Sequence, residues 1–350
     1  MRLVPAGLPV AGPRGRARSP RPVAAAMTGL AVALLAAGCG AKGNATAAHP
    51  AETAITVAAE PGVDDAPLYI AYKDGLFAKA GVKVTIKTFG SAAGDLAALR
   101  SGKADIGFGD YVDYFYSQDV HKGLVAVADG YNAAPGVVEV LTLPRSGIDT
   151  PQSLANQTIG TAEPQGIKTD LTTNPDIPYS IATVATQSVL GNDGVNTGKV
   201  TWKPMPSQDL IGALQNHQVN AILVTEPYIY EAEAKLGAIE VLDSCSGATA
   251  NLPLAGYFTG KSFARQDPVA LQDFRSALLA AQAKAVLAGP VDKVLANVPG
   301  MSMKTATLVT VGDYPTSLSE GSLQRVAQLM FNFGVLPKFL EVSSMVPAAR

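Results

Sequence analysis

The chain has 350 residues, of which 47% are hydrophobic and only 16% are charged, and its formal net charge is −2. This composition excludes an intrinsically disordered chain, which combines low hydrophobicity with high charge, and the near-neutral total argues against a nucleic-acid-binding protein. Two cysteines cannot build a disulfide framework and three histidines offer no metal-ligand spacing, so we expect neither a metal site nor a cofactor. The length suits one large domain or two medium ones.

The first 38 residues have the order of a secretory signal peptide. Five arginines come first, without any acidic residue, and an apolar run over residues 23–37 follows them. A run of about 15 residues is short for a membrane-spanning helix, which needs about 20, and an anchor helix is the alternative. Removal of residues 1–38 leaves 22 basic residues against 29 acidic ones, so the exported protein has a net charge of −7.

The apolar run ends in the sequence LLAAG followed by Cys39, which resembles the bacterial lipoprotein box. The resemblance implies that Cys39 is lipidated and that acyl chains hold the exported protein at the outer face of the cytoplasmic membrane. One departure is Ala36, because the box prefers leucine three places before the cysteine. Residues 39–52 show no apolar periodicity, and we expect a flexible tether there.

From residue 54 onward, short β-branched runs alternate with helical patterns, which indicates an α/β fold. We expect strands over residues 55–57, 82–86, 104–108, 124–128, 157–161, 200–205, 221–224, 238–242 and 254–259. We expect helices from Asp65 to Gly81 and over residues 91–102, 111–122, 180–190, 207–216, 228–236 and 268–288, with more up to residue 339. The strands are expected to form open parallel sheets.

The stretch from Ala66 to Phe77 (APLYIAYKDGLF) resembles the first helix of the periplasmic substrate-binding proteins of ABC importers for nitrate, taurine, alkanesulfonates and thiamine pyrimidines, the NMT1/SsuA-like family. Residues 98–107 resemble the next helix-strand corner of that family, and residues 213–222 repeat this corner in the second half. Glu226-Pro227-Tyr228 matches the Glu-Pro step of the family. The resemblance covers about residues 55–288.

This resemblance implies a two-lobed periplasmic-binding-protein fold of type II, with two chain crossings. The first lobe would comprise residues 53–141 and 243–350, and the second lobe residues 142–242. It also implies a monomer that is not an enzyme, captures a small solute between its lobes and delivers it to a permease with its ATPase. Two alternative functions are that of an enzyme of the same fold, such as a pyrimidine synthase, and that of a lipoprotein that senses its ligand.

In such sheets, ligands bind at the carboxyl ends of the strands, next to helix N-termini. Residues that follow the strand ends or lie on the returning strand are therefore our candidates for ligand binding: Asp64, Asp65, Ser91, Asp110, Tyr111, Tyr131, Asn132, Gln165, Thr225, Glu226, Tyr228 and Tyr257. Asp65 and Glu226 suit helix caps equally well. Tyrosine rings with carboxylates favour a nitrogenous, pyrimidine-like or cationic solute. Helix N-termini alone could instead hold sulfonate, taurine or nitrate anions.

Overall fold

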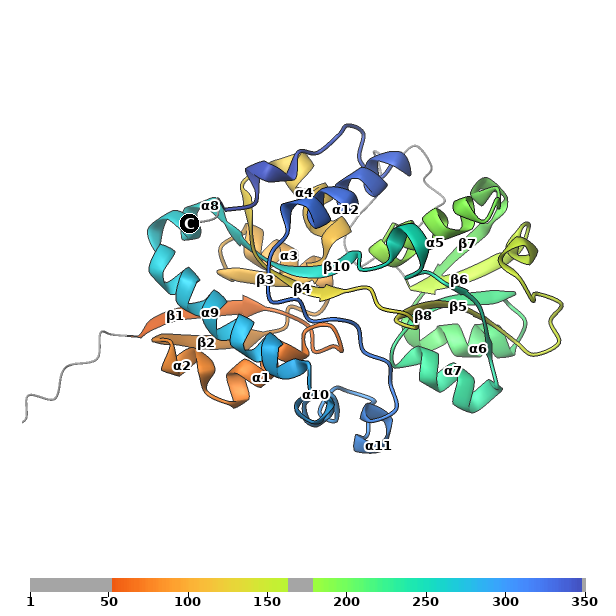
Figure 1. The fold of residues 1–350 in the computed structure, drawn as a ribbon, viewed down its shortest axis with the longest axis horizontal. Helices are drawn as coiled ribbons and strands as arrows, with labels where there is room; N and C mark the ends of the chain where they lie inside the picture. Colours follow the sequence, from red (N-terminus) through yellow and green to blue (C-terminus); the bar gives the residue numbers. More distant parts are fainter. Residues whose placement is uncertain (1–51, 163–178, 348–350) are drawn as a thin grey trace, which may run out of the picture. The chain divides into compact units, whose positions relative to one another are not determined.

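The structure is a computed structural model that describes residues 52–162 and 179–347, all within one compact unit, His49–Arg350 (Figure 1). The predicted signal peptide, Cys39, the predicted tether up to residue 51, and Gln165 lie outside the described residues. The strands of the described part form two five-stranded sheets. The chain passes between these sheets twice, as the sequence predicts.

The first sheet combines the first four strands with a strand from much later in the chain. It contains β1 (Thr53–Ala58), β2 (Val82–Lys87), β3 (Ile106–Asp110), β4 (Leu124–Asn132) and β10 (Pro253–Gly260), in the order β2-β1-β3-β10-β4. Strand β1 is parallel to β2 and β3, whereas β10 is antiparallel to β3 and β4. The expectation of a parallel sheet is therefore wrong at β10, because the chain re-enters this sheet from the second one and runs in the opposite direction.

The second sheet is built on the same plan. It contains β5 (Val138–Thr142), β6 (Thr158–Ala162), β7 (Thr201–Met205), β8 (Ala221–Thr225) and β9 (Ile239–Asp243), in the order β7-β6-β8-β5-β9. Strand β6 is parallel to β7 and β8, and β5 is antiparallel to β8 and β9. The two crossings between sheets are the connections from β4 to β5 and from β9 to β10.

Strand β5 was not among the expected strands, and it moves the expected boundary between the lobes. We expected the first lobe to extend to residue 141, but β5 pairs with strands of the second sheet, so the chain leaves the first sheet before residue 138. All five residues of β5 are buried. Glu139 interrupts the apolar run that would otherwise mark a buried strand.

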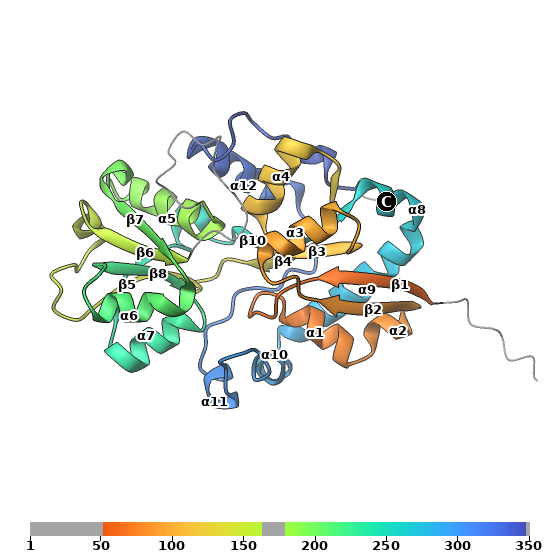
Figure 2. The ribbon, with the colours of Figure 1, turned by 180° about the vertical axis from the view of Figure 1, so that it is seen from behind.

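Helices cover both faces of the first sheet (Figure 2). One face carries α1 (Ala66–Lys73), α2 (Leu76–Lys79), α9 (Pro268–Ala285) and α10 (Ala288–Leu295), and the other carries α3 (Ala92–Arg100), α4 (Tyr111–His121) and α12 (Glu320–Asn332). Two short helices, α8 (Lys261–Gln266) and α11 (Met303–Ala306), belong to connections. Around the second sheet, α5 (Ile181–Asn192) lies on one side, and α6 (Leu210–Gln215) and α7 (Tyr228–Leu236) lie on the other. Helix α12 packs against both α4 and α5.

Three expected elements have different limits in the structure. The helix expected from Asp65 to Gly81 is split into α1 and α2, because Gly75 between them has a φ of 66°, in the left-handed region that favours glycine. The helix expected over residues 207–216 is shorter, because Ser207–Asp209 forms a 3₁₀ turn and α6 begins only at Leu210. Strand β4 continues from the predicted end at residue 128 to Asn132, so Asp129 and Tyr131 lie in a strand and not in a loop.

Within the described ranges, no helix combines the length and hydropathy that crossing a membrane requires. In the same part of the chain, no group of three or more His, Cys, Asp or Glu side chains is arranged to hold a metal ion. Cys245 is a buried free thiol, and burial raises its pKa to about 12. It is therefore a packing residue, since the thiolate is the reactive form.

Candidate functional site

A cavity of about 270 Å³ is lined by residues from both sheets. From the first sheet come the β1–α1 turn and residues of β3, β4 and β10, and from the second come β5, the first turn of α5 and the end of β8. The lining residues are Gly62, Val63, Asp64, Asp110, Tyr131, Val137, Val138, Ser180, Ile181, Ala182, Thr225, Glu226, Leu254 and Ala255. The cavity lies near the lower end of the range for ligand sites, roughly 300–1,000 Å³, and therefore suits a small solute.

The rule that ligands bind at strand ends correctly brings together five of the twelve candidate residues. The five that line the cavity are Asp64, Asp110, Tyr131, Thr225 and Glu226. They lie on both sides of the cavity, although up to 162 positions of sequence separate them. Whether they bind a solute stays a prediction.

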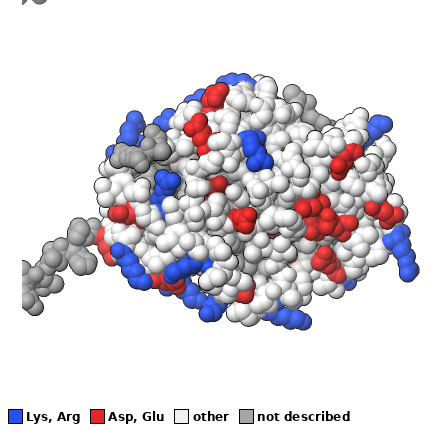
Figure 3. Space-filling view, in the orientation of Figure 1, with Lys and Arg blue, Asp and Glu red and all other residues white. Residues whose placement is uncertain are grey.

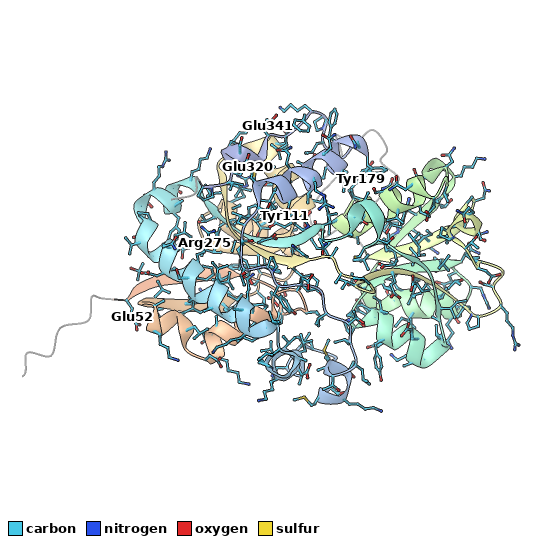
Figure 4. The ribbon with its side chains drawn as sticks, in the orientation of Figure 1. Glu52, Tyr111, Tyr179, Arg275, Glu320 and Glu341 are labelled. Atoms are coloured by element: carbon cyan, nitrogen blue, oxygen red, sulfur yellow. The ribbon has the colours of Figure 1, made fainter. Side chains whose placement is uncertain are left out.

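The other candidate tyrosines do not line the cavity. Tyr111, which lies in the interior of the part built on the first sheet (Figure 4), and Tyr257 are completely buried. The Tyr111 hydroxyl donates a hydrogen bond of 2.8 Å to Oδ1 of Asp129. Tyr228 is the half-buried first residue of α7. Tyr131 is thus the only aromatic residue among the lining residues, so the predicted surround of several tyrosine rings is not formed in the described part of the site.

Three further polar candidates have structural partners instead. Asp65 is fully buried, its Oδ1 accepts a hydrogen bond from the N–H of Gly62 at 3.0 Å, and it does not cap α1 as the sequence suggested. Ser91 caps α3, because its Oγ accepts from the N–H of Gly94 at 3.1 Å. Asn132 pairs through its backbone with Asp313.

Asp64 lies in the tight β1–α1 turn at the cavity wall. A Cβ atom added to Gly62 would lie only 2.4 Å from Oδ1 of Asp64, so the turn needs glycine at this position to hold the carboxyl group where it is. The backbone N–H groups of Asp64 and Asp65 stabilise the ionised carboxyl group, but burial outweighs them and raises its pKa to about 6. At neutral pH this side chain is mostly an ionised acceptor at the cavity wall.

Asp110 connects the two sides of the cavity. Its Oδ1 accepts from the N–H of Val112 at 2.7 Å and so caps α4, while its Oδ2 accepts from the N–H of Ile181 at 2.9 Å, at the start of α5. Burial, followed by the charges of Asp113 and Asp64, raises its pKa to about 8 in spite of these hydrogen bonds. Both oxygens of this carboxyl group therefore have backbone donors.

Glu226 makes a second connection, from the opposite side. Its Oε2 accepts from the N–H of Tyr230 at 3.1 Å, within its own side of the cavity. Its Oε1 accepts from the N–H of Thr310 at 3.0 Å, in the connection between α11 and α12. Burial raises the pKa of this carboxyl group above its usual value.

The connection that supplies Thr310 is itself bound to the first sheet. We call its residues 309–314 the crossing segment; it is separate from the two connections in which the chain passes between the sheets. The N–H of Gly312 donates to the Tyr131 hydroxyl at 2.6 Å, and Asp313 pairs with Asn132 of β4. The Tyr314 hydroxyl donates to the carbonyl oxygen of Val63 at 2.6 Å, in the turn that holds Asp64. The crossing segment thus joins the β1–α1 turn, β4 and Glu226.

The sequence predicted the start of α5 but did not place it at the site. Ser180, Ile181 and Ala182 line the cavity, and Ser180 caps the helix by accepting from the N–H of Thr183. The S-x-x-T spacing marks this helix start, but it does not show that the helix points at the site. Apolar lining residues such as Val138 and Leu254 carry no sequence signal that distinguishes them from core.

Among the described residues, the charge of the cavity wall is one-sided, because the described lining includes three acidic residues and no Lys, Arg or His. Just behind it, burial and the charges of Glu240 and Glu233 raise the pKa of Glu139 in β5 to about 8. On one face, acidic side chains gather over the second sheet while most Lys and Arg side chains lie near the rim (Figure 3). The arrangement is suited to a cation or a hydrogen-bond donor.

The family model described as "NMT1/THI5 like" matches residues 63–292 of the chain. No curated protein matches the sequence. Among solved structures, the alkanesulfonate-binding protein SsuA from Xanthomonas axonopodis pv. citri, bound to MOPS, is similar at 19% identity with a TM-score of 0.66, over 87% of this chain and 100% of that one. The periplasmic nitrate-binding protein NrtA from Synechocystis PCC 6803 is similar at 14% identity with a TM-score of 0.61, over 81% and 82% of the two chains.

The desulfurization enzyme DSZB is also similar, at 16% identity with a TM-score of 0.63, over 84% of this chain and 96% of that one. At these identities the similarities show the fold alone. That fold is the periplasmic-binding-protein fold, so the fold class predicted from the sequence is confirmed.

Proposed function

Because the chain belongs to the NMT1/THI5-like family, we propose that it is a solute-binding lipoprotein of an ABC importer. Each sheet with its helices forms one lobe, the cavity between them captures a small nitrogenous, cationic solute, and the protein delivers this solute to a membrane permease. The names of SsuA and NrtA support the transport role, and the signal-like N-terminus with Cys39 supports export and a lipid anchor. Tethering to the membrane would raise the effective concentration of the binding protein at the permease.

The observation that carries the choice of solute is the charge of the cavity lining. Within residues 52–162 and 179–347, no basic side chain accompanies Asp64, Asp110 and Glu226 in the cavity lining. A buried carboxylate gains most from a cationic hydrogen-bond donor, because the ion pair offsets the desolvation that raises its pKa. An anionic solute would instead bring its negative charge against carboxyl groups whose pKa values burial already raises.

The second candidate is an anion such as a sulfonate or nitrate, which the names of two neighbours favour. Helix N-termini hold anions through free N–H groups and the positive end of the helix dipole. In this chain the first N–H of α5 already donates to the carboxyl group of Asp110, so this N–H is not free to hold an anion. We therefore rank the anion second.

A thermal-shift screen of the protein tests the solute class, since a ligand stabilises the folded state by mass action. We expect aminopyrimidines, amidines or polyamines to raise the melting temperature, and methanesulfonate, taurine and nitrate to leave it unchanged. Stabilisation by the anions alone would contradict the proposed solute class. Mass spectrometry of the recovered solute separates binding from catalysis, because an enzyme of this fold, as DSZB is, would convert its ligand.

The anchor has its own test. Cys39→Ser removes the thiol that would carry the acyl chains, so we expect the protein to move from the membrane fraction to the soluble exported fraction. A protein that stays in the membrane fraction would support the alternative of a spanning anchor helix. The matched control is Cys245→Ser, because that buried thiol has no role in the proposed anchor.

A further inference from the structure

We propose that the three cavity acids have two different roles: Asp64 receives the cationic group of the solute, whereas Asp110 and Glu226 are positioning residues that hold the two lobes together. This inference deepens the function proposed above and rests on it for the identity of the solute. The division follows from where each carboxyl group finds its hydrogen-bond donors.

Asp110 uses one oxygen on each side of the cavity. Its Oδ1 caps α4 in its own lobe, and its Oδ2 accepts from the N–H of Ile181, the first residue of α5, in the other lobe. A carboxylate at a helix N-terminus is stabilised by both the N–H group and the helix dipole. Asp110 therefore links the N-termini of two helices that belong to different sheets.

Glu226 repeats this arrangement from the second lobe. One oxygen accepts from the N–H of Tyr230 in α7, the helix that follows Glu226, and the other accepts from the N–H of Thr310 in the crossing segment. The crossing segment is paired with β4 of the first sheet through Asp313 and Asn132. We call the bonds from Ile181 to Asp110 and from Thr310 to Glu226 the two cross-lobe hydrogen bonds.

Asp64 differs from both. The N–H groups that stabilise its carboxyl group are its own and that of Asp65, both within its own turn. No hydrogen bond from the second lobe reaches its side chain in the described part of the chain, although the side chain lines the cavity. Gly62 leaves the space for this carboxyl group. Of the three acids, it is the one whose donors all lie within its own turn, so a solute can use its remaining acceptor sites without disturbing a bond between the lobes.

The first test uses amide hydrogen exchange of the solute-free full chain, and it needs no ligand. Asp110→Asn and Glu226→Gln each keep one acceptor oxygen, which can satisfy only one of the two N–H groups. If these bonds hold the lobes together, then either variant should speed exchange at least tenfold at both Ile181 and Thr310, because opening exposes both sites. Asp267→Asn, at an exposed acid before α9, is the control for loss of a charge and should change neither amide.

A merely local role gives a different result. If Asp110→Asn speeds exchange only at Ile181 and Glu226→Gln only at Thr310, the proposed cross-lobe role is overturned. Asp110→Ser guards against misfolding, because serine still caps α4 but is too short to serve Ile181 as well. It should reproduce the effect of Asp110→Asn at Thr310.

The second test compares benzamidinium with benzamide, which have nearly the same shape but differ in charge. We expect the native chain to bind benzamidinium at least tenfold more tightly, Asp64→Asn to abolish this preference, and Asp110→Asn to weaken both probes by the same factor. Equal binding of the two probes, or binding of neither, overturns the role of Asp64. The exchange result stands in either case, so failure of the solute proposal and failure of the cross-lobe role can be told apart.

Discussion

The β1–α1 turn and the crossing segment border the same cavity but use their polar groups in opposite ways. The turn leaves the carboxyl group of Asp64 at the cavity wall with donors from its own backbone only. The crossing segment offers backbone N–H groups that carboxylate and hydroxyl oxygens already occupy, at Glu226 and Tyr131. In the proposed roles, a carboxyl group at a strand end either binds the solute or joins parts of the fold, according to which donors surround it.

The largest expected loss of stability comes from adding a methyl group to the tightly packed crossing segment. A Cβ atom on Gly312 would lie 2.4 Å from the carbonyl oxygen of Asn132 and 2.9 Å from the Tyr131 ring. Because the nearest atom belongs to backbone, Gly312→Ala should lower the free energy of unfolding by about 2–3 kcal/mol, as overpacking does in cores. Chemical denaturation measures this.

The control for that variant is Gly321→Ala. Gly321 lies in the first turn of α12, where the nearest atom to an added Cβ is 4.0 Å away. Alanine should be neutral or slightly stabilising there. If Gly312→Ala and Gly321→Ala lose the same free energy of unfolding, the crossing segment is not packed more tightly than the first turn of α12. The contrast between the crossing segment and the β1–α1 turn would then fail.

A smaller effect is expected where the crossing segment meets the turn. Tyr314→Phe removes the hydroxyl that donates to the Val63 carbonyl, and the loss of this buried hydrogen bond should cost about 1 kcal/mol. Since Val63 precedes Asp64, binding of a cationic solute should weaken as well. Tyr72→Phe is the control, because Tyr72 is 56% exposed. An unchanged melting temperature and affinity in Tyr314→Phe would show that the turn is rigid without the crossing segment.

An effect confined to one pH window concerns a buried carboxyl group outside both regions. Burial raises the pKa of Asp129 to about 7 from a reference value of 3.8, so between these values the folded chain binds more protons than the unfolded chain. Stability due to this group is therefore lost as pH rises from about 4 to about 7 and is constant outside that window.

Asp129→Asn should remove this pH-dependent contribution, because asparagine does not titrate. Its amide oxygen can still accept the hydrogen bond from Tyr111. The melting temperature of the variant should fall less between pH 4 and pH 7 than that of the native chain. Asp105→Asn is the comparison at another acid with a backbone donor, the N–H of Thr56. If the melting temperature of Asp129→Asn changes with pH as much as that of the native chain, this carboxyl group does not titrate in that range.

Local signals predicted most of the fold. Helix α7 has the limits expected from the sequence, directly after Pro227, and the alternation of Val82 and Val84 with lysines and threonine marked β2 correctly. Strand β5 was missed because a buried strand has no period of its own and Glu139 breaks its apolar run. The direction of β10 is set by the second crossing, which no local pattern records.

Only part of the site was predictable, because contacts between residues far apart in sequence distinguish its members. The strand-end rule placed Asp64, Asp110 and Glu226 around one cavity, but it treated them as equivalent. Their difference depends on two N–H donors, Ile181 and Thr310, which are 71 and 84 residues away from their acceptors in sequence. Only the folded chain brings these groups together.

The most direct measurement is a calorimetric titration of the full chain with benzamidinium and, under the same conditions, with methanesulfonate. We expect a heat of binding with benzamidinium that grows between pH 5 and pH 7, because the pKa of Asp64 is about 6 and ionisation strengthens the ion pair. We expect no binding of methanesulfonate. Tighter binding of methanesulfonate than of benzamidinium would contradict the claim that this cavity is built for a cation.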